Sequence, residues 1–272
     1  MTEDLENKLV EDILRSGFGS EIRSLKIIKE AGWQATGISH YIDLDTGLSR
    51  ESDIEAHTLV HLASDDDKKV LLQCFYSLSI EVKKSNKPWI IFRENPNFGF
   101  QISECGYGLA FCDGIKMIRG LTGSGFLSET SLAESLGWYG NGVHESFKKP
   151  DQPSRWYSAC VSVCKAAEHE LKQNSWEIDP DSSQYPYLWI SKPVLVLDGL
   201  LYSADLDENH EILLIPEKFA SLKFIFQNQN YKRREYFVDI VTIENLNEYL
   251  SFCSDRNFKI SGKLKKKAGI YA

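Results

Sequence analysis

Residues 70–84, "VLLQCFYSLSIEVKK", alternate apolar and polar side chains in their second half. This period of two predicts a β-strand with one face toward a core, because successive strand side chains point to opposite faces. Leu78, Ile80 and Val82 form the apolar face. Ser79, Glu81 and Lys83 form the other face, so an acid and a base project together where the strand leaves the sheet.

The segments before this strand predict a helix followed by two strands. In "SEIRSLKIIKEAGW" (20–33), the spacing of Ile22, Leu25 and Ile28 is typical of an amphipathic helix. Ser20 is its expected N-cap and Gly32 its left-handed stop. Segments of about 33–44 and 51–62 predict two strands joined by a turn at 45–47, and "SDDDKK" (64–69) predicts the next turn.

A hairpin centred near residue 67 places two acids opposite each other. Asp53 lies 14 positions before this centre (67 − 53) and Glu81 lies 14 after it (81 − 67). Two ionised carboxylates about 4 Å apart repel by about 4 kcal/mol at an effective dielectric of about 20. Lys83 offsets part of this repulsion. A divalent cation such as Mg²⁺ or Mn²⁺ offsets more of it, and such an ion can activate water for phosphodiester hydrolysis. The alternative is a solvated cross-strand salt bridge without function.

The second half of the chain returns to regular elements. Residues 154–174 predict a helix, and residues 192–199 and 200–207 predict two strands around Gly199. Further strands are expected within 211–227 and 234–242. A last helix is expected over 242–253, with Thr242 as its cap. Leu246, Tyr249, Leu250 and Cys253 are expected on its buried side.

Residues 93–153 interrupt this pattern. The window holds 10 of the 18 glycines (99, 106, 108, 114, 120, 123, 125, 137, 140 and 142), interleaved with aromatic residues. We interpret it as an irregular insert with short helices inside a single domain spanning 1–272. A lid or substrate wall and a packed surface excursion without function are both open interpretations.

Together, "SGFGSE", "YIDLDTGLSRESDIEA" and "LSIEVKKSNKPWIIF" resemble the PD-(D/E)xK nuclease superfamily, in particular its bacterial stand-alone or defence-associated members. The resemblance is specific over about 16–92 and looser over 154–250. It implies an α/β fold of the restriction-endonuclease-like type: an αβββαβ core with a mixed central sheet, the irregular insert, and extra C-terminal strands and helix.

The resemblance also implies roles for individual residues. Asp53, Glu81 and the main-chain carbonyl of Val82 would bind the Mg²⁺ or Mn²⁺ ion, and Lys83 would be the catalytic lysine. Glu21 matches an acidic residue that many members carry on the first helix. The sequence departs from the literal pattern at Ser52, where the family has a proline. The implied activity is endonuclease cleavage of DNA, with RNA as the alternative substrate.

The formal net charge of −8 excludes a uniformly basic, histone-like surface but leaves room for a local basic groove. Lys84 and the cluster Lys232, Arg233 and Arg234 are the residues expected to contact phosphates, although charge runs commonly only solvate a surface. A homodimer or a regulatory partner would complete such a groove.

The acidic N-terminus lacks the features of a secretory signal, and no apolar run has the length of a membrane span. The six cysteines form no CxxC pair, which favours reduced thiols and a cytoplasmic location. Cys160 and Cys164 are expected on one core face. The leading hypothesis is therefore a metal-dependent nuclease. The alternatives are a catalytically silent nuclease-fold module that binds nucleic acid or a partner protein, and a defence effector that stays silent until a partner or small signal rearranges 93–153.

Overall fold

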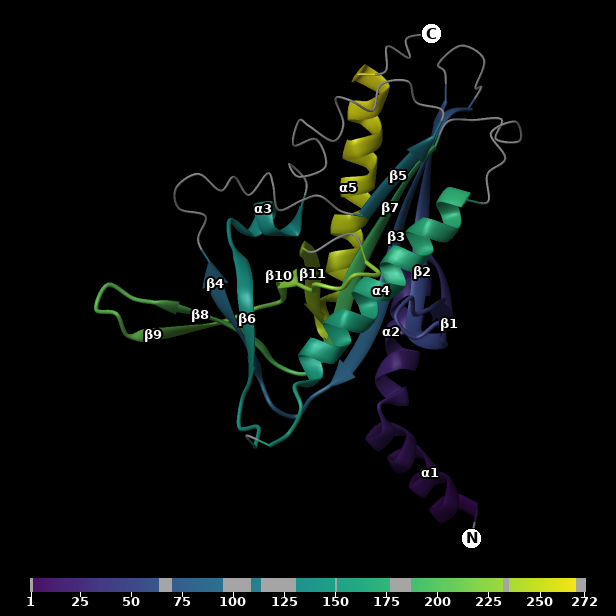
Figure 1. The fold of residues 1–272 in the computed structure, drawn as a ribbon. Coiled ribbons are helices and arrows are strands. Elements are labelled where there is room, and N and C mark those ends of the chain that lie inside the picture. Colours follow the sequence, from purple (N-terminus) through teal and green to yellow (C-terminus); the bar gives the residue numbers. More distant parts are fainter. Residues whose placement is uncertain are drawn as a thin grey trace.

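The computed structural model describes residues 2–63, 70–94, 109–113, 131–149, 151–176, 187–231 and 235–267. These residues form a mixed α/β fold in which helices pack on an eleven-stranded mixed sheet (Figure 1). The predicted turn at 64–69 lies outside the described residues. Within the described part, no helix has the length and apolar character needed to cross a membrane.

The helices are α1 (Thr2–Ser16), α2 (Phe18–Glu30), α3 (Leu132–Leu136), α4 (Arg155–Trp176) and α5 (Leu246–Lys267), and a 3-10 turn (Ile243–Asn245) precedes α5. The strands are β1 (Gln34–Ile42), β2 (Ser49–Ala63), β3 (Val70–Lys84), β4 (Trp89–Glu94), β5 (Leu109–Asp113), β6 (Tyr139–Glu145), β7 (Tyr187–Asp198), β8 (Leu201–Leu206), β9 (Ile212–Pro216), β10 (Phe219–Ile225) and β11 (Glu235–Thr242).

The sheet has the order β1-β2-β3-β7-β11-β10-β6-β4-β8-β9, and β5 pairs with the first part of β7. β1, β2 and β3 form an antiparallel meander, whereas β3, β7 and β11 are parallel. The chain runs α2, β1, β2, β3, then β4, β5, α3 and β6, and then α4 and β7. A helix, three strands, a helix and a strand therefore follow in the expected order, with the expected interruption between β3 and α4.

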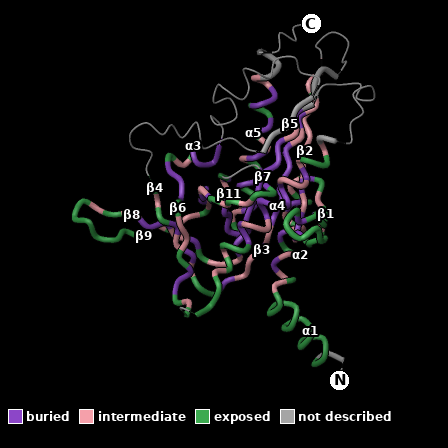
Figure 2. The backbone as a smooth tube through the Cα atoms, viewed as in Figure 1, coloured by how far each residue is buried: buried purple, intermediate pink, exposed green. Residues whose placement is uncertain are grey.

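The two largest hydrophobic cores lie on opposite faces of the sheet. Much of β3 and β7 between them is buried, whereas α1 is exposed over residues 4–16 (Figure 2). Alternate side chains of β7 separate the two cores: Val194 and Val196 belong to the core under α2 and α5, while Leu195 and Leu197 belong to the core under α4. This alternation follows from the period of two in a strand. A strand that is buried on both faces is apolar throughout, as "PVLVL" is.

The first core helix begins earlier than the sequence predicts. α2 starts at Phe18, and its N-cap is Gly17 in a left-handed conformation (φ 98°) rather than Ser20. Ser20 is buried inside the helix, where its hydroxyl donates to Asp198 at the end of β7. The predicted apolar stripe is also wrong at Ile22, which is 62% exposed. Gly32 ends the helix region with a positive φ of 83°, as expected.

The segment 93–153 contributes strands to the sheet, which the interpretation as an irregular insert did not include. β5 pairs antiparallel with β7, and β6 pairs with β4 and β10. The short helix α3 agrees with the expected short helices. Its N-cap is Ser131, whose hydroxyl accepts from the Glu134 amide, and Gly137 ends it in a left-handed conformation. The remaining residues of the window, 95–108, 114–130 and 150, lie outside the described residues.

The C-terminal helix is longer than expected and reaches Lys267. Its predicted apolar side, Leu246, Tyr249, Leu250 and Cys253, is fully buried. Thr242 occupies the N-cap position of the preceding 3-10 turn, but its hydroxyl makes no backbone capping bond. It accepts instead from the Asn245 side chain at 2.8 Å. Cys160 and Cys164 are both buried in the core under α4, as predicted, and neither forms a disulfide.

Candidate metal-dependent active site

The pairing of β2 with β3 brings Asp53 to Glu81. The last paired residues of this ladder are Ile54 and Ile80, so the next position along each strand is Asp53 and Glu81. The predicted hairpin register is therefore confirmed. The carboxylate of Asp53 turns toward β3, where its Oδ2 accepts from the Val82 amide at 2.7 Å. This bond fixes the orientation of Asp53 beside the end of β3.

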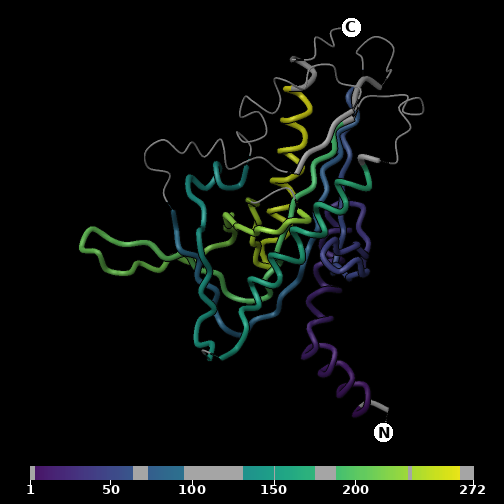
Figure 3. The backbone as a smooth tube through the Cα atoms, viewed as in Figure 1, coloured from purple at the N-terminus to yellow at the C-terminus, as the bar shows by residue number. Residues whose placement is uncertain are grey.

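The predicted faces of β3 are also confirmed. Leu78 and Ile80 are fully buried and Val82 is 6% exposed, all in the core under α2 and α5. Ser79 and Glu81 bond to side chains of α4, which packs beside β3 although it is distant in the sequence (Figure 3), and Lys83 contacts Glu81. The acid and the lysine thus share one side of the strand, at its exit from the sheet.

Lys83 lies at the centre of the candidate site. Its Nζ contacts Glu81 Oε1 at 2.5 Å and donates to the Val82 carbonyl at 3.2 Å. The same nitrogen lies 3.9 Å from Asp53 Oδ2. The side chains of Asp53, Glu81 and Lys83 are only 14–26% exposed. In this enclosed setting the three charges interact more strongly than they would in water.

Glu21, on α2, interacts electrostatically with Asp53, Glu81 and Lys83. Burial raises the pKa of the Glu21 carboxyl, and the charges of Asp53 and Glu81 raise it further, against the lowering effect of Lys83. Burial likewise raises the pKa of Glu81, where Lys83 acts in the lowering direction and Asp53 in the raising direction. The structure therefore brings Asp53, Glu81 and Lys83 close together, and the Glu21 carboxyl lies within range of their charges, so that three acids surround one ammonium.

Two residues that the sequence analysis did not identify support Glu81. Ser162 on α4 donates its hydroxyl to Glu81 Oε2 at 3.3 Å. The Ser162 hydroxyl in turn lies 3.4 Å from the Tyr41 hydroxyl on β1. No signal in the sequence points to either residue, because their contacts arise only from the packing of α4 across the sheet.

The basic residues near the site come from two elements. Lys84 follows Lys83 along the chain, and its Nζ donates to the Leu14 carbonyl of α1 at 2.8 Å. Arg155 begins α4; its guanidinium donates to the Lys84 carbonyl at 3.3 Å and to Ser85 Oγ at 3.2 Å. The Arg155 side chain is 52% exposed. Sequence analysis missed Arg155, whereas the predicted cluster Lys232, Arg233 and Arg234 lies outside the described residues.

The oxygen donors fit a hard divalent cation. Mg²⁺ and Mn²⁺ prefer carboxylate and carbonyl oxygens, and Asp53, Glu81 and the Val82 carbonyl provide three of these. The ammonium of Lys83 already lies among the same three oxygens. A divalent cation on this set would therefore require Lys83 Nζ to withdraw from at least one of them. Among the residues described, no cluster of three His, Cys, Asp or Glu side chains is arranged to hold a metal.

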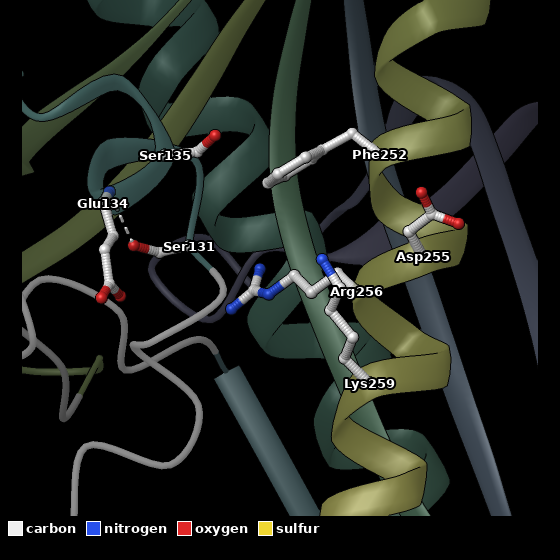
Figure 4. A pocket seen from close by; sticks show the side chains of 7 residues that line it. All are labelled: Ser131, Glu134, Ser135, Phe252, Asp255, Arg256 and Lys259. Atoms are coloured by element: carbon white, nitrogen blue, oxygen red, sulfur yellow. Dashed lines mark hydrogen bonds between the residues drawn. The ribbon is translucent and has the colours of Figure 1, made fainter.

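Two cavities lie away from this cluster. One, of about 250 Å³, lies between α3 and α5 and is lined by Ser131, Glu134, Ser135, Phe252, Asp255, Arg256 and Lys259 (Figure 4). The other, of about 390 Å³, is lined by residues of β4, β6, α4 and β10. Neither lining includes a residue of the acid cluster, which consists of Glu21, Asp53 and Glu81 around Lys83. In the first cavity, Arg256 is buried and donates to the Tyr76 hydroxyl at 2.6 Å, which indicates a packing role.

Comparisons with known proteins give no relatives for this chain: no family model matches it, and no curated protein or solved structure is significantly similar.

Proposed function

We propose that the protein is a metal-dependent nuclease that hydrolyses phosphodiester bonds of DNA, with RNA as the alternative substrate. One observation carries the proposal: Asp53, Glu81 and Lys83 converge at the end of β3, and the Val82 carbonyl lies within reach of the same ammonium. The resemblance to the PD-(D/E)xK superfamily assigns these same positions to metal binding and catalysis.

In this proposal Asp53, Glu81 and the Val82 carbonyl hold one Mg²⁺ or Mn²⁺ ion. The ion supplies Lewis-acid activation of the phosphoryl group and of the attacking water. Lys83 orients that water through its Nζ protons and stabilises the negative charge that develops on the phosphoryl oxygens. The pKa of Glu21 is shifted by the charges of Asp53, Glu81 and Lys83, and this carboxyl would bind a second ion or its water.

The basic side chains of Lys84 and Arg155, beside the acid cluster, would hold the nucleic-acid backbone. Lys84 follows Lys83 at the end of β3, where its ammonium donates to the Leu14 carbonyl of α1, and the Arg155 guanidinium donates to the Lys84 carbonyl. Phosphate contacts of this kind position the backbone without reading its sequence. Because such binding releases counterions, we expect the affinity to fall steeply with salt concentration.

A catalytically silent module is the second candidate, and one contact favours it. The Lys83 ammonium engages Glu81 and the Val82 carbonyl directly, so the strongest local charge pair is satisfied without a metal ion. A module of this kind would bind nucleic acid or a partner protein without cutting. Calorimetry separates the two functions: titration with Mn²⁺ should release or absorb heat only if the acid cluster binds the ion.

Cleavage assays test the leading proposal. The wild-type protein and Lys83→Ala are incubated with supercoiled plasmid, single-stranded DNA and RNA in Mg²⁺ or Mn²⁺. Losing a group that positions a proton typically lowers the rate by about 100-fold or more. Lys26→Ala, an exposed lysine of α2, is the matched control and should cleave like wild type. Equal cleavage by Lys83→Ala and wild type would reject the assignment.

A further inference from the structure

The cavity of about 390 Å³ lies where β6 and β10 separate. Within the described residues, these parallel strands pair only at Leu222 and Gly140. The cavity lies beyond this pair, because its lining includes Asn141 of β6 and residues 223–225 of β10. Pockets that hold small molecules have volumes of about 300–1,000 Å³. The cavity is therefore large enough for a small planar ligand.

Part of the lining is a cluster of aromatic rings. Trp156 and Tyr157, in the first turn of α4, both contact the Phe224 ring of β10 edge to face, with ring centroids 6.3 and 5.3 Å apart. The centroids of Trp156 and Tyr157 lie 5.7 Å apart. Phe224 is 3% exposed, whereas Tyr157 is 46% exposed. The cluster therefore offers an accessible ring, Tyr157, on a buried support, which suits the stacking of a flat ligand.

The polar groups of the lining both donate and accept hydrogen bonds. Asn141 Nδ2 donates to Glu94 Oε2 at 2.7 Å, and both residues are exposed. Lys223 also lines the cavity and pairs with Glu235 at 3.3 Å. An unpaired nucleobase is recognised by stacking on aromatic rings and by hydrogen bonds to its edge. The aromatic cluster and the Asn141–Glu94 pair supply both kinds of contact.

An organic cation fits this lining less well. Sites for such cations place them over ring faces in an aromatic cage. The rings of Trp156, Tyr157 and Phe224 contact one another, so no cation fits between them. The lining also carries one carboxylate, Glu94, and one ammonium, Lys223, so its formal charge is zero. A neutral planar base is therefore the favoured ligand.

The cavity and the acid cluster meet on the same part of α4 (Figure 1). Arg155, directly before Trp156, donates to the Lys84 carbonyl at the end of β3. Ser162 of the same helix donates to Glu81. Since a helix rises about 1.5 Å per residue, Trp156 and Ser162 are about 9 Å apart along its axis. A strand whose phosphate contacts Arg155 can therefore reach both the cavity and the acid cluster.

We propose that this cavity binds one unpaired base of a single-stranded nucleic acid, close to the bond that is cut. The base stacks on Tyr157 and its edge bonds to Asn141 and Glu94. The assignment rests on the proposed nuclease function and narrows its substrate to unpaired strands. A base within a duplex would first have to leave its stack and its partner, which costs free energy.

Fluorescence anisotropy with a labelled single-stranded DNA tests the cavity. The full chain carrying Lys83→Ala serves as the parent, so that binding is measured in Mn²⁺ without cleavage. Adding Tyr157→Ala should weaken binding by about 5- to 150-fold, the range for the loss of one base–aromatic stack. Tyr157→Phe keeps the ring and should bind like the parent. Phe258→Ala removes an exposed ring of α5 outside the cavity and is the matched control.

A DNA backbone of the same length without bases separates stacking from phosphate contacts. It should bind the parent and Tyr157→Ala alike, because it offers no ring to Tyr157. Equal binding of the complete single strand by these two proteins would overturn the proposal, as would equal affinity of the parent for the single strand and for its blunt duplex. Displacement of the DNA by tetramethylammonium, at a concentration at which sodium has no effect, would assign the cavity to an organic cation instead.

Failure of the nuclease function would give a different result. The wild-type protein would then leave the single strand uncut in Mn²⁺, while binding still depended on Tyr157 and on the bases. That outcome would support the base-binding cavity and reject the nuclease. Cleavage by wild type together with unchanged binding in Tyr157→Ala would instead reject the cavity alone.

Discussion

Glu81 is held at both of its carboxylate oxygens. Lys83 Nζ contacts Oε1 at 2.5 Å, and the Ser162 hydroxyl donates to Oε2 at 3.3 Å. Both contacts act to lower the pKa of Glu81, against the raising effect of burial and of the Asp53 charge. The charged form of Glu81, which a metal ion requires, therefore depends on neighbours that come from β3 itself and from α4.

Ser162→Ala tests the part played by α4. Without this hydroxyl the pKa of Glu81 should rise further, so the acid limb of the pH–rate profile should move to higher pH. A hydrogen bond of this length is worth about 0.5–1.5 kcal/mol, so we expect a loss in cleavage rate of about 3- to 10-fold at neutral pH. The measurement is the cleavage rate as a function of pH in Mn²⁺.

Ser158→Ala is the matched control for this prediction. Ser158 lies one helical turn before Ser162, and its hydroxyl donates to the Arg155 carbonyl of its own helix. Its removal should leave the pH–rate profile in place. An unshifted profile in Ser162→Ala would show that the hydroxyl does not tune Glu81.

The sequence predicts that Asp53, Glu81 and Lys83 lie together, but it does not predict the residues that contact them from other elements. The reason is physical. Strand alternation and hairpin symmetry are local rules, and they place two acids and a lysine together without knowledge of the rest of the fold. Ser162 and Arg155 reach the site only after α4 packs across β3, so their roles depend on tertiary contacts. Ser20 is a similar case, because its position beside Asp198 is visible only once β7 has joined β3.

At the scale of elements, one buried carboxylate of α4 bonds to two strands of the sheet. Glu170 accepts hydrogen bonds from Ser77, Ser79 and Ser191, which lie on β3 and β7. Burial, together with the charge of Glu55, raises the pKa of Glu170 to about 7 despite these three bonds. The native state therefore holds a proton at Glu170 over a range of pH in which the unfolded chain has released it.

Glu170→Gln tests this linkage. Because the pKa of Glu170 in the folded chain lies above its ordinary value of 4.5, this group stabilises the native state fully below pH 4.5. That stability is lost as the pH rises toward and through 7. A shift from 4.5 to about 7 corresponds to about 3 kcal/mol. The glutamine keeps hydrogen-bonding capacity and carries no charge, so the variant should be more stable than wild type by up to about this amount at pH 8.

Denaturant unfolding at a series of pH values measures the effect. The difference between Glu170→Gln and wild type should be small near pH 4.5 and should grow up to pH 8. Glu168→Gln, two positions earlier on the same helix, makes the same chemical change and is the control. A difference that does not vary with pH would contradict the linkage.

The elements could be predicted where apolar residues recur at a regular spacing, and not elsewhere. Alternation predicts β3, an apolar run predicts β7, and the apolar side formed by Leu246, Tyr249 and Leu250 predicts α5. β5 and β6 lie in a glycine-rich window whose residues show no sustained period. Their strand conformation is set by the edges that they meet, on β7 for β5 and on β4 and β10 for β6.

At the scale of the whole molecule, two cores share one sheet, and the acid cluster lies at the end of β3 where α2 and α4 approach from opposite faces. Folding therefore brings Asp53 and Glu81 together around the Lys83 ammonium, partly out of water, with the Glu21 carboxyl within range of their charges. Like charges so placed destabilise the native state unless a cation compensates for them. Stability and metal binding should consequently be linked through this cluster.

Glu81→Gln should separate the two effects. In metal-free solution at neutral pH the variant should unfold at a higher temperature than wild type, because it removes a carboxylate whose ionised form burial and Asp53 disfavour. The gain should disappear near pH 4, where Glu81 is protonated in the native and unfolded chains alike. Addition of Mn²⁺ should raise the unfolding temperature of wild type, since an ion that binds only the native state stabilises it, and should do so weakly or not at all for the variant.

Differential scanning calorimetry with and without Mn²⁺ measures both quantities in one experiment. Glu248→Gln, an exposed acid of α5 paired with Lys218, is the matched control and should respond to Mn²⁺ as wild type does. If Glu81→Gln keeps the full Mn²⁺ response, the ion binds elsewhere on the chain. If the variant is less stable than wild type without metal, the contact with Lys83 outweighs the repulsion, and the cluster is then a self-sufficient ion pair with no net demand for a cation.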